Sequence, residues 1–221
     1  MRCIQTGLAL VLLCGPVAAV ALVTEAPVTE RPYETIVITA PATDARVYLG
    51  ALDNFPDMYE ITSHEPFTLH AVIRQMLPAP EAELIPFSLV LVRQDDRGGG
   101  VSEVARLRHD SDAWERVSDA RVAMSFLESR TVSVPVASGT YRIEISTPEN
   151  LGRYWLQIGA TPSSAGYIAT LGHIRAVQRH FQVGWWRFFW SSYVFYPLGI
   201  ALLLTGLGVT WRNRQRWFHV A

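Results

Sequence analysis

The amino-acid sequence predicts an all-β fold, an antiparallel β-sandwich of jelly-roll or immunoglobulin-like type, flanked by segments of membrane character. Short segments in which apolar and polar residues alternate follow one another between residues 34 and 160, and this period of two is typical of half-buried strands. Turn-forming residues separate them, for example three consecutive glycines at 98–100. Residues 191–211 contain no Asp, Glu, Lys, Arg or His, which predicts one transmembrane helix.

Composition limits what the part between the two apolar segments can do. The chain has 221 residues, which leaves room for one domain of ordinary size. All 19 residues counted as Lys or Arg are arginines, and 15 of them accompany 20 acidic residues in this middle part. Such a mildly acidic domain excludes nucleic acid as an expected partner, because phosphate binding needs clustered positive charge. Cys3 and Cys14 lie in the N-terminal apolar segment, so disulfides are not expected to stabilise the domain.

Residues 1–21 are predicted to be a secretory signal peptide. Arg2 precedes an apolar run that ends in a small-residue pattern, which signal peptidase could cut after Ala21. Two alternatives stay open. Residues 4–23 could remain as a first membrane span, and Cys14 could be a lipoprotein cysteine, although the residue before it is a leucine rather than a small residue.

Residues 22–33 are predicted to be an extended linker, because they combine prolines with alternating charges and show no apolar periodicity. The extracytoplasmic β-sandwich is predicted to span residues 34–160, with an irregular, proline-bounded crossover around residues 79–84. The ten strand candidates are residues 35–39, 46–49, 58–62, 67–74, 87–93, 101–108, 121–126, 131–136, 140–146 and 153–159.

A juxtamembrane amphipathic helix is predicted within residues 163–190. Its apolar stripe can pack on the sandwich, lie in the outer headgroup layer, or continue into the membrane helix as a stalk. The headgroup layer is favoured because the stripe leads into an aromatic-rich segment, where Arg187 can reach the headgroups. The stripe consists of Ile168, Leu171, Ile174, Val177 and Phe181, at spacings of three and four.

Residues 191–211 are the predicted transmembrane helix, and residues 212–221 are a basic tail. Tryptophans at both ends of an apolar helix are typical of the headgroup layers, and the positive-inside rule places an arginine-rich tail in the cytoplasm. The expected location is therefore the inner membrane, as a single-pass protein with most of the chain in the periplasm. The predicted membrane-interface residues are Trp185, Trp186, Arg187, Trp190, Trp211, Arg212, Arg214 and Arg216.

Two features lie within the predicted membrane helix. Pro197 removes a backbone hydrogen bond and predicts a modest kink. Gly199 and Gly206 share a helix face on which another helix could approach, although glycine is common in such helices without any such role.

The later strand candidates carry a resemblance to a known family. The segment Ser-Gly-Thr-Tyr-Arg-Ile-Glu-Ile-Ser at 138–146 and the segment Gly-Arg-Tyr-Trp-Leu-Gln-Ile-Gly at 152–159 resemble the closing strands of bacterial pre-peptidase C-terminal domains. Residues 58–61, 66–69 and 87–92 fall where that family has earlier strands, so the resemblance covers about residues 57–159. It implies a non-catalytic accessory module of secreted or surface proteins, sometimes involved in binding polymers. This chain departs from the pattern by carrying its own anchor and no peptidase domain.

No catalytic, cofactor or metal site is predicted. The sequence lacks His-Glu-x-x-His, Gly-x-Ser-x-Gly and Cys-x-x-Cys motifs, and its six histidines are scattered singly. Asp95 and Asp96 beside three glycines could bind calcium, but a solvated hairpin tip is the favoured interpretation. Trp114 lies among charged residues and is the candidate ligand platform, although capping of the sandwich core is the favoured interpretation.

These observations predict a binding or scaffolding component of a bacterial envelope complex rather than an enzyme. The expected partners are the lipid bilayer and a membrane protein, because a ten-residue tail is too short to signal alone. The alternative is a membrane-tethered module that binds a carbohydrate or another polymer, or that acts as a sensor. That alternative depends on the family resemblance and on Trp114.

Overall fold

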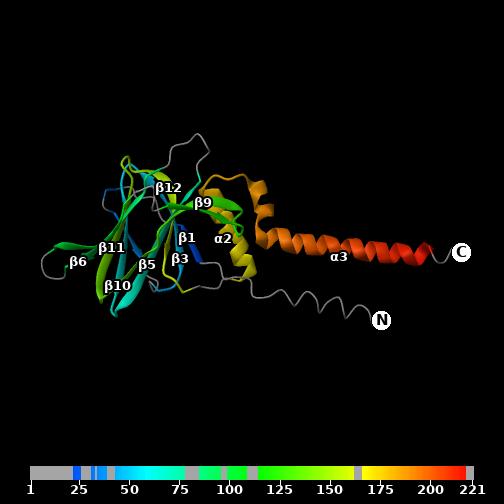
Figure 1. The fold of residues 1–221 in the computed structure, drawn as a ribbon, viewed down its shortest axis with the longest axis horizontal. Coiled ribbons are helices and arrows are strands. Elements are labelled where there is room, and N and C mark those ends of the chain that lie inside the picture. Colours follow the sequence, from blue (N-terminus) through cyan, green and yellow to red (C-terminus); the bar gives the residue numbers. More distant parts are fainter. Residues whose placement is uncertain are drawn as a thin grey trace.

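The computed structural model describes residues 22–25, 31–32, 34–38, 43–77, 85–95, 99–108, 114–161 and 166–217, of which residues 22–25 and 214–217 are described by their backbone. Two β-sheets lie against each other in this part of the chain, and one long helix projects away from them (Figure 1). The predicted signal peptide, residues 1–21, lies outside the described residues.

The larger sheet, called sheet A here, has seven described strands, and the smaller, sheet B, has five. Sheet A has the order β1 (Leu22–Glu25), β3 (Arg46–Asp53), β12 (Leu151–Ile158), β5 (Phe67–Met76), β9 (Met124–Ser129) and β8 (Trp114–Asp119), with β10 (Val132–Val136) also paired to β5. Sheet B has the order β2 (Thr35–Ile38), β4 (Asp57–Ser63), β11 (Gly139–Ser146), β6 (Ser88–Gln94) and β7 (Val101–Leu107).

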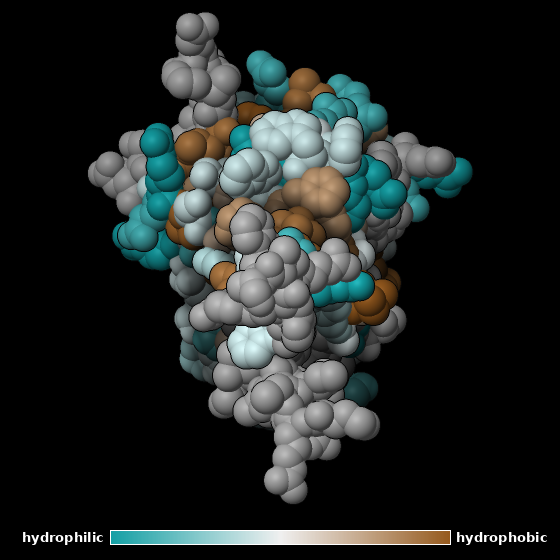
Figure 2. Space-filling model, turned by 90° about the vertical axis from the view of Figure 1, so that its right-hand side faces the viewer, coloured by the Kyte–Doolittle hydropathy of each residue, from teal (hydrophilic) through white to brown (hydrophobic). Residues whose placement is uncertain are grey.

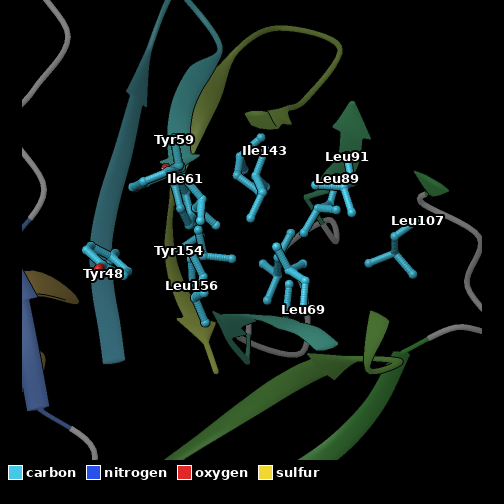
Figure 3. Packing of buried hydrophobic residues seen from close by; sticks show 14 of the residues in the cluster. Tyr48, Tyr59, Ile61, Leu69, Leu89, Leu91, Leu107, Ile143, Tyr154 and Leu156 are labelled. Carbon is cyan, nitrogen blue, oxygen red and sulfur yellow. The ribbon is translucent and has the colours of Figure 1, made fainter. Parts of the chain in front are cut away.

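The core lies between the two sheets and is filled by alternate residues of facing strands (Figure 3). In β11, for instance, Tyr141, Ile143 and Ile145 are buried while the residues between them are half-buried. Because successive side chains of a strand point to opposite faces, this alternation turns one apolar face of each sheet inward. The predicted two-sheet β fold is therefore confirmed.

A chain of hydrogen bonds crosses this core. The Tyr154 hydroxyl donates to Asp57 Oδ2 at 2.5 Å, and the hydroxyl oxygens of Tyr59 and Tyr154 are 2.8 Å apart. Asp57 and Tyr59 belong to β4 and Tyr154 to β12, so these bonds link sheet B to sheet A. Burial raises the pKa of both tyrosines. Gly50 provides the space, because a Cβ at this position would lie 2.3 Å from the Tyr154 hydroxyl oxygen.

The strands differ from the sequence prediction at three places. Residues 22–25, predicted as linker, form β1 and pair in parallel with β3. Strand β8 was not predicted, because its apolar residues Trp114 and Val117 are three apart rather than two. Strand β9 begins at Met124 rather than at residue 121, since residues 120–123 form the turn from β8. A second parallel pair, β2 with β4, makes the sandwich mixed rather than purely antiparallel.

Three helical segments follow the sandwich: α2 (Tyr167–His180), the 3-10 helix η3 (Trp185–Trp190) and α3 (Ser192–Trp217). The single helix predicted within residues 163–190 is thus interrupted. The interruption lies at Gln182, whose φ of 56° is left-handed and cannot continue a right-handed helix. Residues Ser192–Asn213 of α3 are long and apolar enough to cross a membrane.

Candidate membrane-docking site

Helix α2 lies on the outer face of sheet A. In β3 and β12, Tyr48, Tyr154 and Leu156 point into the core between the sheets. Their neighbours Val47, Leu49 and Trp155 belong to a second buried cluster, and alternate strand residues face opposite sides. The remaining buried members of this cluster are Val122, Met124, Phe126, Ile174, Val177, Phe181 and Tyr193.

This packing corrects the expected position of the apolar stripe. Ile174, Val177 and Phe181 are buried against sheet A, whereas the sequence favoured the headgroup layer. Ile168, at the start of α2, is 78% exposed, so only part of the stripe packs on sheet A. The physical reason is that sheet A offers α2 an apolar outer face, and burial there removes the stripe from water as effectively as lipid does.

Aromatic rings form the centre of the contact between α2 and sheet A. The Phe126 ring lies 5.6 Å from that of Trp155 and 5.6 Å from that of Phe181, edge to face in both pairs. The Arg74 guanidinium lies 5.1 Å from the centre of the Trp155 ring. At the end of α2, Arg153 Nη1 donates to the His180 carbonyl at 2.9 Å. The helix is therefore attached at its C-terminal half.

Residues 178–192, from the end of α2 to the start of α3, bind the turn between β8 and β9. Each carbonyl of residues 120–123 accepts a hydrogen bond from this segment, and we call these four bonds the carbonyl clasp. Satisfying four successive carbonyls near the surface fixes the turn relative to the start of α3. The bonds run from Ser192 N to Ala120 O (2.9 Å), Ser191 Oγ to Arg121 O (2.5 Å), Gln178 Nε2 to Val122 O (2.9 Å) and Arg187 Nη1 to Ala123 O (3.1 Å).

Asp119 holds the same turn from inside. Its carboxylate accepts from the backbone N–H and the guanidinium of Arg121, with the Nη2 contact at 2.6 Å, and lies 3.2 Å from Arg74 Nη1. Burial acts to raise the pKa of Asp119, but the hydrogen bonds and charges of Arg121 and Arg74 outweigh it, so the pKa lies below its ordinary value. The carboxylate is thus charged at neutral pH and orders the turn that carries the clasp.

Exposed aromatic side chains lie in η3 and in the first turns of α3. We call Trp185, Trp186, Phe189, Trp190, Phe195 and Tyr196 the aromatic collar, and each is exposed, Trp185 to 66%. The Trp190 and Phe195 rings stack with centres 6.1 Å apart. Seen from the side to which α3 points, brown and pale residues gather in the upper part of the face, with teal residues around them (Figure 2). Aromatic rings exposed beside an apolar helix are typical of a headgroup layer.

Helix α3 has almost no contact with the sandwich. Tyr193 is buried, and its carbonyl accepts from the Tyr167 hydroxyl at 2.7 Å, but every residue described from Phe195 onward is exposed. Figure 1 shows the helix projecting freely from the domain. Of the predicted interface residues at its far end, Trp211 and Arg212 are exposed, while the side chains of Arg214 and Arg216 lie outside the description.

The predicted ligand platform is not formed. Trp114 is only 9% exposed and belongs to the core cluster between the sheets. The structure therefore contradicts an exposed platform at this residue. An indole ring at a sandwich edge removes more apolar surface from water by capping the core than by facing solvent. The favoured interpretation of Trp114, that it caps the sandwich core, is therefore the correct one.

The two aspartates considered as calcium ligands are described only in part. Asp95 is described and Asp96 is not, and no group of three His, Cys, Asp or Glu side chains suited to a metal occurs among the described residues. Among the described residues His173 Nε2 is buried without a hydrogen-bond partner, and burial lowers the pKa of His173.

The carbonyl clasp could not be predicted from the sequence, because a backbone acceptor has no residue-specific signature.

Comparison with known proteins gives one structural neighbour to report. No protein-family model and no curated protein matches the chain. The pre-peptidase C-terminal domain of a collagenase from Bacillus anthracis matches with 12% sequence identity and a TM-score of 0.35, covering 59% of this chain and 98% of that domain. This match is to the same kind of domain that the later strands resemble in sequence.

Proposed function

We propose that this protein is a binding or scaffolding component of a bacterial envelope complex, anchored by α3 with its β-sandwich outside the cytoplasm. The observation that carries the proposal is the carbonyl clasp together with the packing of α2 on sheet A. A domain that needed only to stay near a membrane would be served by a flexible linker. Here the domain and the first turn of the anchor share buried contacts, which fixes the face that the domain presents.

The dimensions of α3 support a membrane anchor. Its predominantly apolar span of 22 residues, Ser192–Asn213, extends over about 33 Å at 1.5 Å per residue, close to the roughly 30 Å of a hydrocarbon core. The aromatic collar lies at its start, and Trp211 and Arg212 lie at its end. The arginines from residue 212 onward favour a cytoplasmic C-terminus and hence an outward sandwich.

The free surface of α3 supports a partner within the membrane. In the described chain Phe195 stacks on Trp190, every described residue of α3 from Phe195 onward is exposed, and open space surrounds the Cα atoms of Gly199 and Gly206. In a bilayer this surface meets either lipid or another helix. The polymer-binding alternative loses Trp114 as its ligand platform, since this residue is buried, and keeps only the family resemblance.

Crosslinking in intact cells tests the scaffolding role. The full chain would be crosslinked, extracted with detergent, and its partners identified by peptide mass spectrometry, with a membrane protein expected among them. A clasp variant, Gln178→Ala with Ser191→Ala, keeps α3 intact and should still insert while losing crosslinks to the sandwich. Arg116→Gln, at an exposed position of β8 on sheet A, is the control and should leave the crosslinks unchanged. Recovery of no membrane protein, or crosslinks indifferent to the clasp, would refute the proposal.

Topology is tested separately, with a C-terminal reporter fusion, protease access from outside and N-terminal sequencing. The expected result is a cytoplasmic C-terminus and a mature chain that begins at Leu22, the first residue of β1. An intact Met1 would indicate two membrane spans. A C-terminus outside the cytoplasm would reverse the orientation on which the proposed function depends.

A further inference from the structure

A cleft opens between the end of sheet A and the segment that leads into α3. Its volume is about 360 Å³, within the range of about 300 to 1,000 Å³ typical of ligand pockets. One wall comes from the end of β5 and the start of β9. The other wall comes from η3 and from the residues between α2 and η3. The lining residues are Met76, Leu77, Met124, Ser125, Val183 and Arg187.

The chemistry of this cleft is apolar with one cation at its edge. Four of its six lining side chains are aliphatic or thioether groups. The backbone of Ser125 is already used, because its carbonyl accepts from Leu77 N at 3.0 Å. A peptide would need several backbone partners that such a lining does not offer, whereas a hydrocarbon chain with one anionic group needs a single donor cluster.

Arg187 can provide that donor cluster. Its Nη1 donates to the Ala123 carbonyl, and its guanidinium lies 5.5 Å from the centre of the Trp186 ring. Within the described residues no carboxylate lies within ion-pair distance of it. A guanidinium has five N–H groups in a planar fork that matches the oxygens of a phosphate, and the clasp bond uses one of them.

The position of the cleft selects the source of the phosphate. Arg187 lies within η3, between the exposed rings of Trp186 and Phe189 in the aromatic collar. If α3 spans the membrane, as the proposed function requires, the collar lies in the outer headgroup layer and the cleft opens beside it. The anionic group nearest to Arg187 is then the phosphate of a membrane lipid.

We propose that this cleft binds one glycerophospholipid of the outer leaflet. The phosphate pairs with Arg187, and the upper part of an acyl chain lies along Met76, Leu77, Met124 and Val183. Bound in this way, the lipid bridges the end of sheet A and the start of the anchor, so that lipid binding reinforces the orientation set by the clasp. This inference rests on the proposed membrane anchoring and adds a specific ligand to it.

Photolabelling tests the site. The full chain would be reconstituted in vesicles of phosphatidylethanolamine and phosphatidylglycerol containing a trace of a phospholipid with a diazirine in its acyl chain. After irradiation, peptide mass spectrometry should find label at Met76, Leu77 or Val183. Arg187→Gln should lower this labelling about tenfold, since hydrogen bonds to charged groups are worth about that factor. Arg187→Lys should retain part of it.

The matched control and a second variant separate the cleft from general attraction to the surface. Arg116→Gln removes an exposed arginine on β8 that has no polar contact among the described residues, and labelling should stay unchanged. Val183→Trp fills the cleft and leaves Arg187 in place, so labelling should also fall about tenfold. Circular dichroism of each variant checks that the sandwich is folded.

Three results would overturn the lipid site. Label confined to α3 would mean that only bulk lipid is in contact with the protein. Loss of label in Arg187→Gln but not in Val183→Trp would mean a surface charge effect without a cleft. Crosslinks from the cleft to another segment of the same chain would mean that protein, not lipid, occupies it. In each case insertion and the partner crosslinks of the proposed function can remain, so the two failures are distinguishable.

Discussion

The two sheets differ in what covers their outer faces. On sheet B the outer face of β4 and β11 carries half-exposed polar side chains, with Arg142 Nε donating to Glu60 at 3.0 Å. On sheet A the outer face of β3 and β12 is buried under α2. The same contrast is visible in the burial of consecutive residues: β11 alternates, while Tyr154, Trp155 and Leu156 of β12 are all buried. A strand buried on both faces loses its period of two.

This difference shows which outer face of the sandwich is already covered by the chain itself. The face of sheet A is occupied by the segment that leads into the anchor, so it is unavailable to a partner. The face of sheet B and the aromatic collar stay exposed in the described chain. We therefore propose the face of sheet B for a partner outside the membrane and the aromatic collar for lipid.

Removing a ring from the contact between α2 and sheet A should have the largest effect. Phe126 is fully buried and contacts both Trp155 and Phe181. Phe126→Ala is expected to lower the free energy of unfolding by about 3 to 5 kcal/mol. Urea unfolding of the detergent-solubilised chain, followed by tryptophan fluorescence, measures the change.

The matched variant on sheet B is Val92→Ala, at a half-buried position of β6. Its loss should stay below about 1 kcal/mol, because little apolar area leaves the interior. Equal losses for the two variants would contradict the idea that only sheet A has a second buried face.

The polar chain within the core should give an intermediate effect. Tyr154→Phe removes the donor that Asp57 accepts from across the two sheets, and a hydrogen bond to a charged group contributes about 1.5 to 3 kcal/mol. Tyr59→Phe removes only the contact between two hydroxyls, worth about 1 kcal/mol. The same unfolding measurement compares them, and a larger loss for Tyr59→Phe would reverse the assigned roles.

Most strands could be predicted from the sequence, because alternation of apolar and polar residues indicates a strand with one buried face. It also contained a clue to the covered face that periodicity alone does not use. The runs Val47-Tyr48-Leu49 and Tyr154-Trp155-Leu156 are apolar at consecutive positions, which indicates burial on both sides. Reading them together with the stripe of α2 would have placed that helix on sheet A.

Other features could not be predicted, and the reasons are physical. A helical stripe shows that one face is buried, but lipid and protein bury it equally well. Strand β8 has only Trp114 and Val117 as apolar residues, too few to show a period. The carbonyl clasp uses backbone acceptors in a turn, and its donors, Gln178 and Ser191, look like ordinary polar residues in the sequence.

The smallest expected effect concerns the pH dependence of the turn that carries the clasp. The folded pKa of Asp119 lies below its ordinary value of 3.8. A carboxyl group with a lowered folded pKa contributes stability above the unfolded pKa, and this contribution is lost as the pH falls from about 3.8 through the folded value. Asp119→Asn should therefore lower the stability more at neutral pH than at acid pH, which flattens the acid limb of the stability profile.

The exposed pair on sheet B provides the control for this comparison. Arg142 and Glu60 have side chains that are 36% and 23% exposed, and such surface pairs contribute about 0 to 1 kcal/mol. Glu60→Gln should thus leave both the neutral stability and the acid limb nearly unchanged. Thermal unfolding of the full chain between pH 2 and pH 7, with both variants in parallel, measures this. An acid limb that Glu60→Gln flattens more than Asp119→Asn would place the pH-sensitive contact on sheet B, away from the turn that binds the anchor.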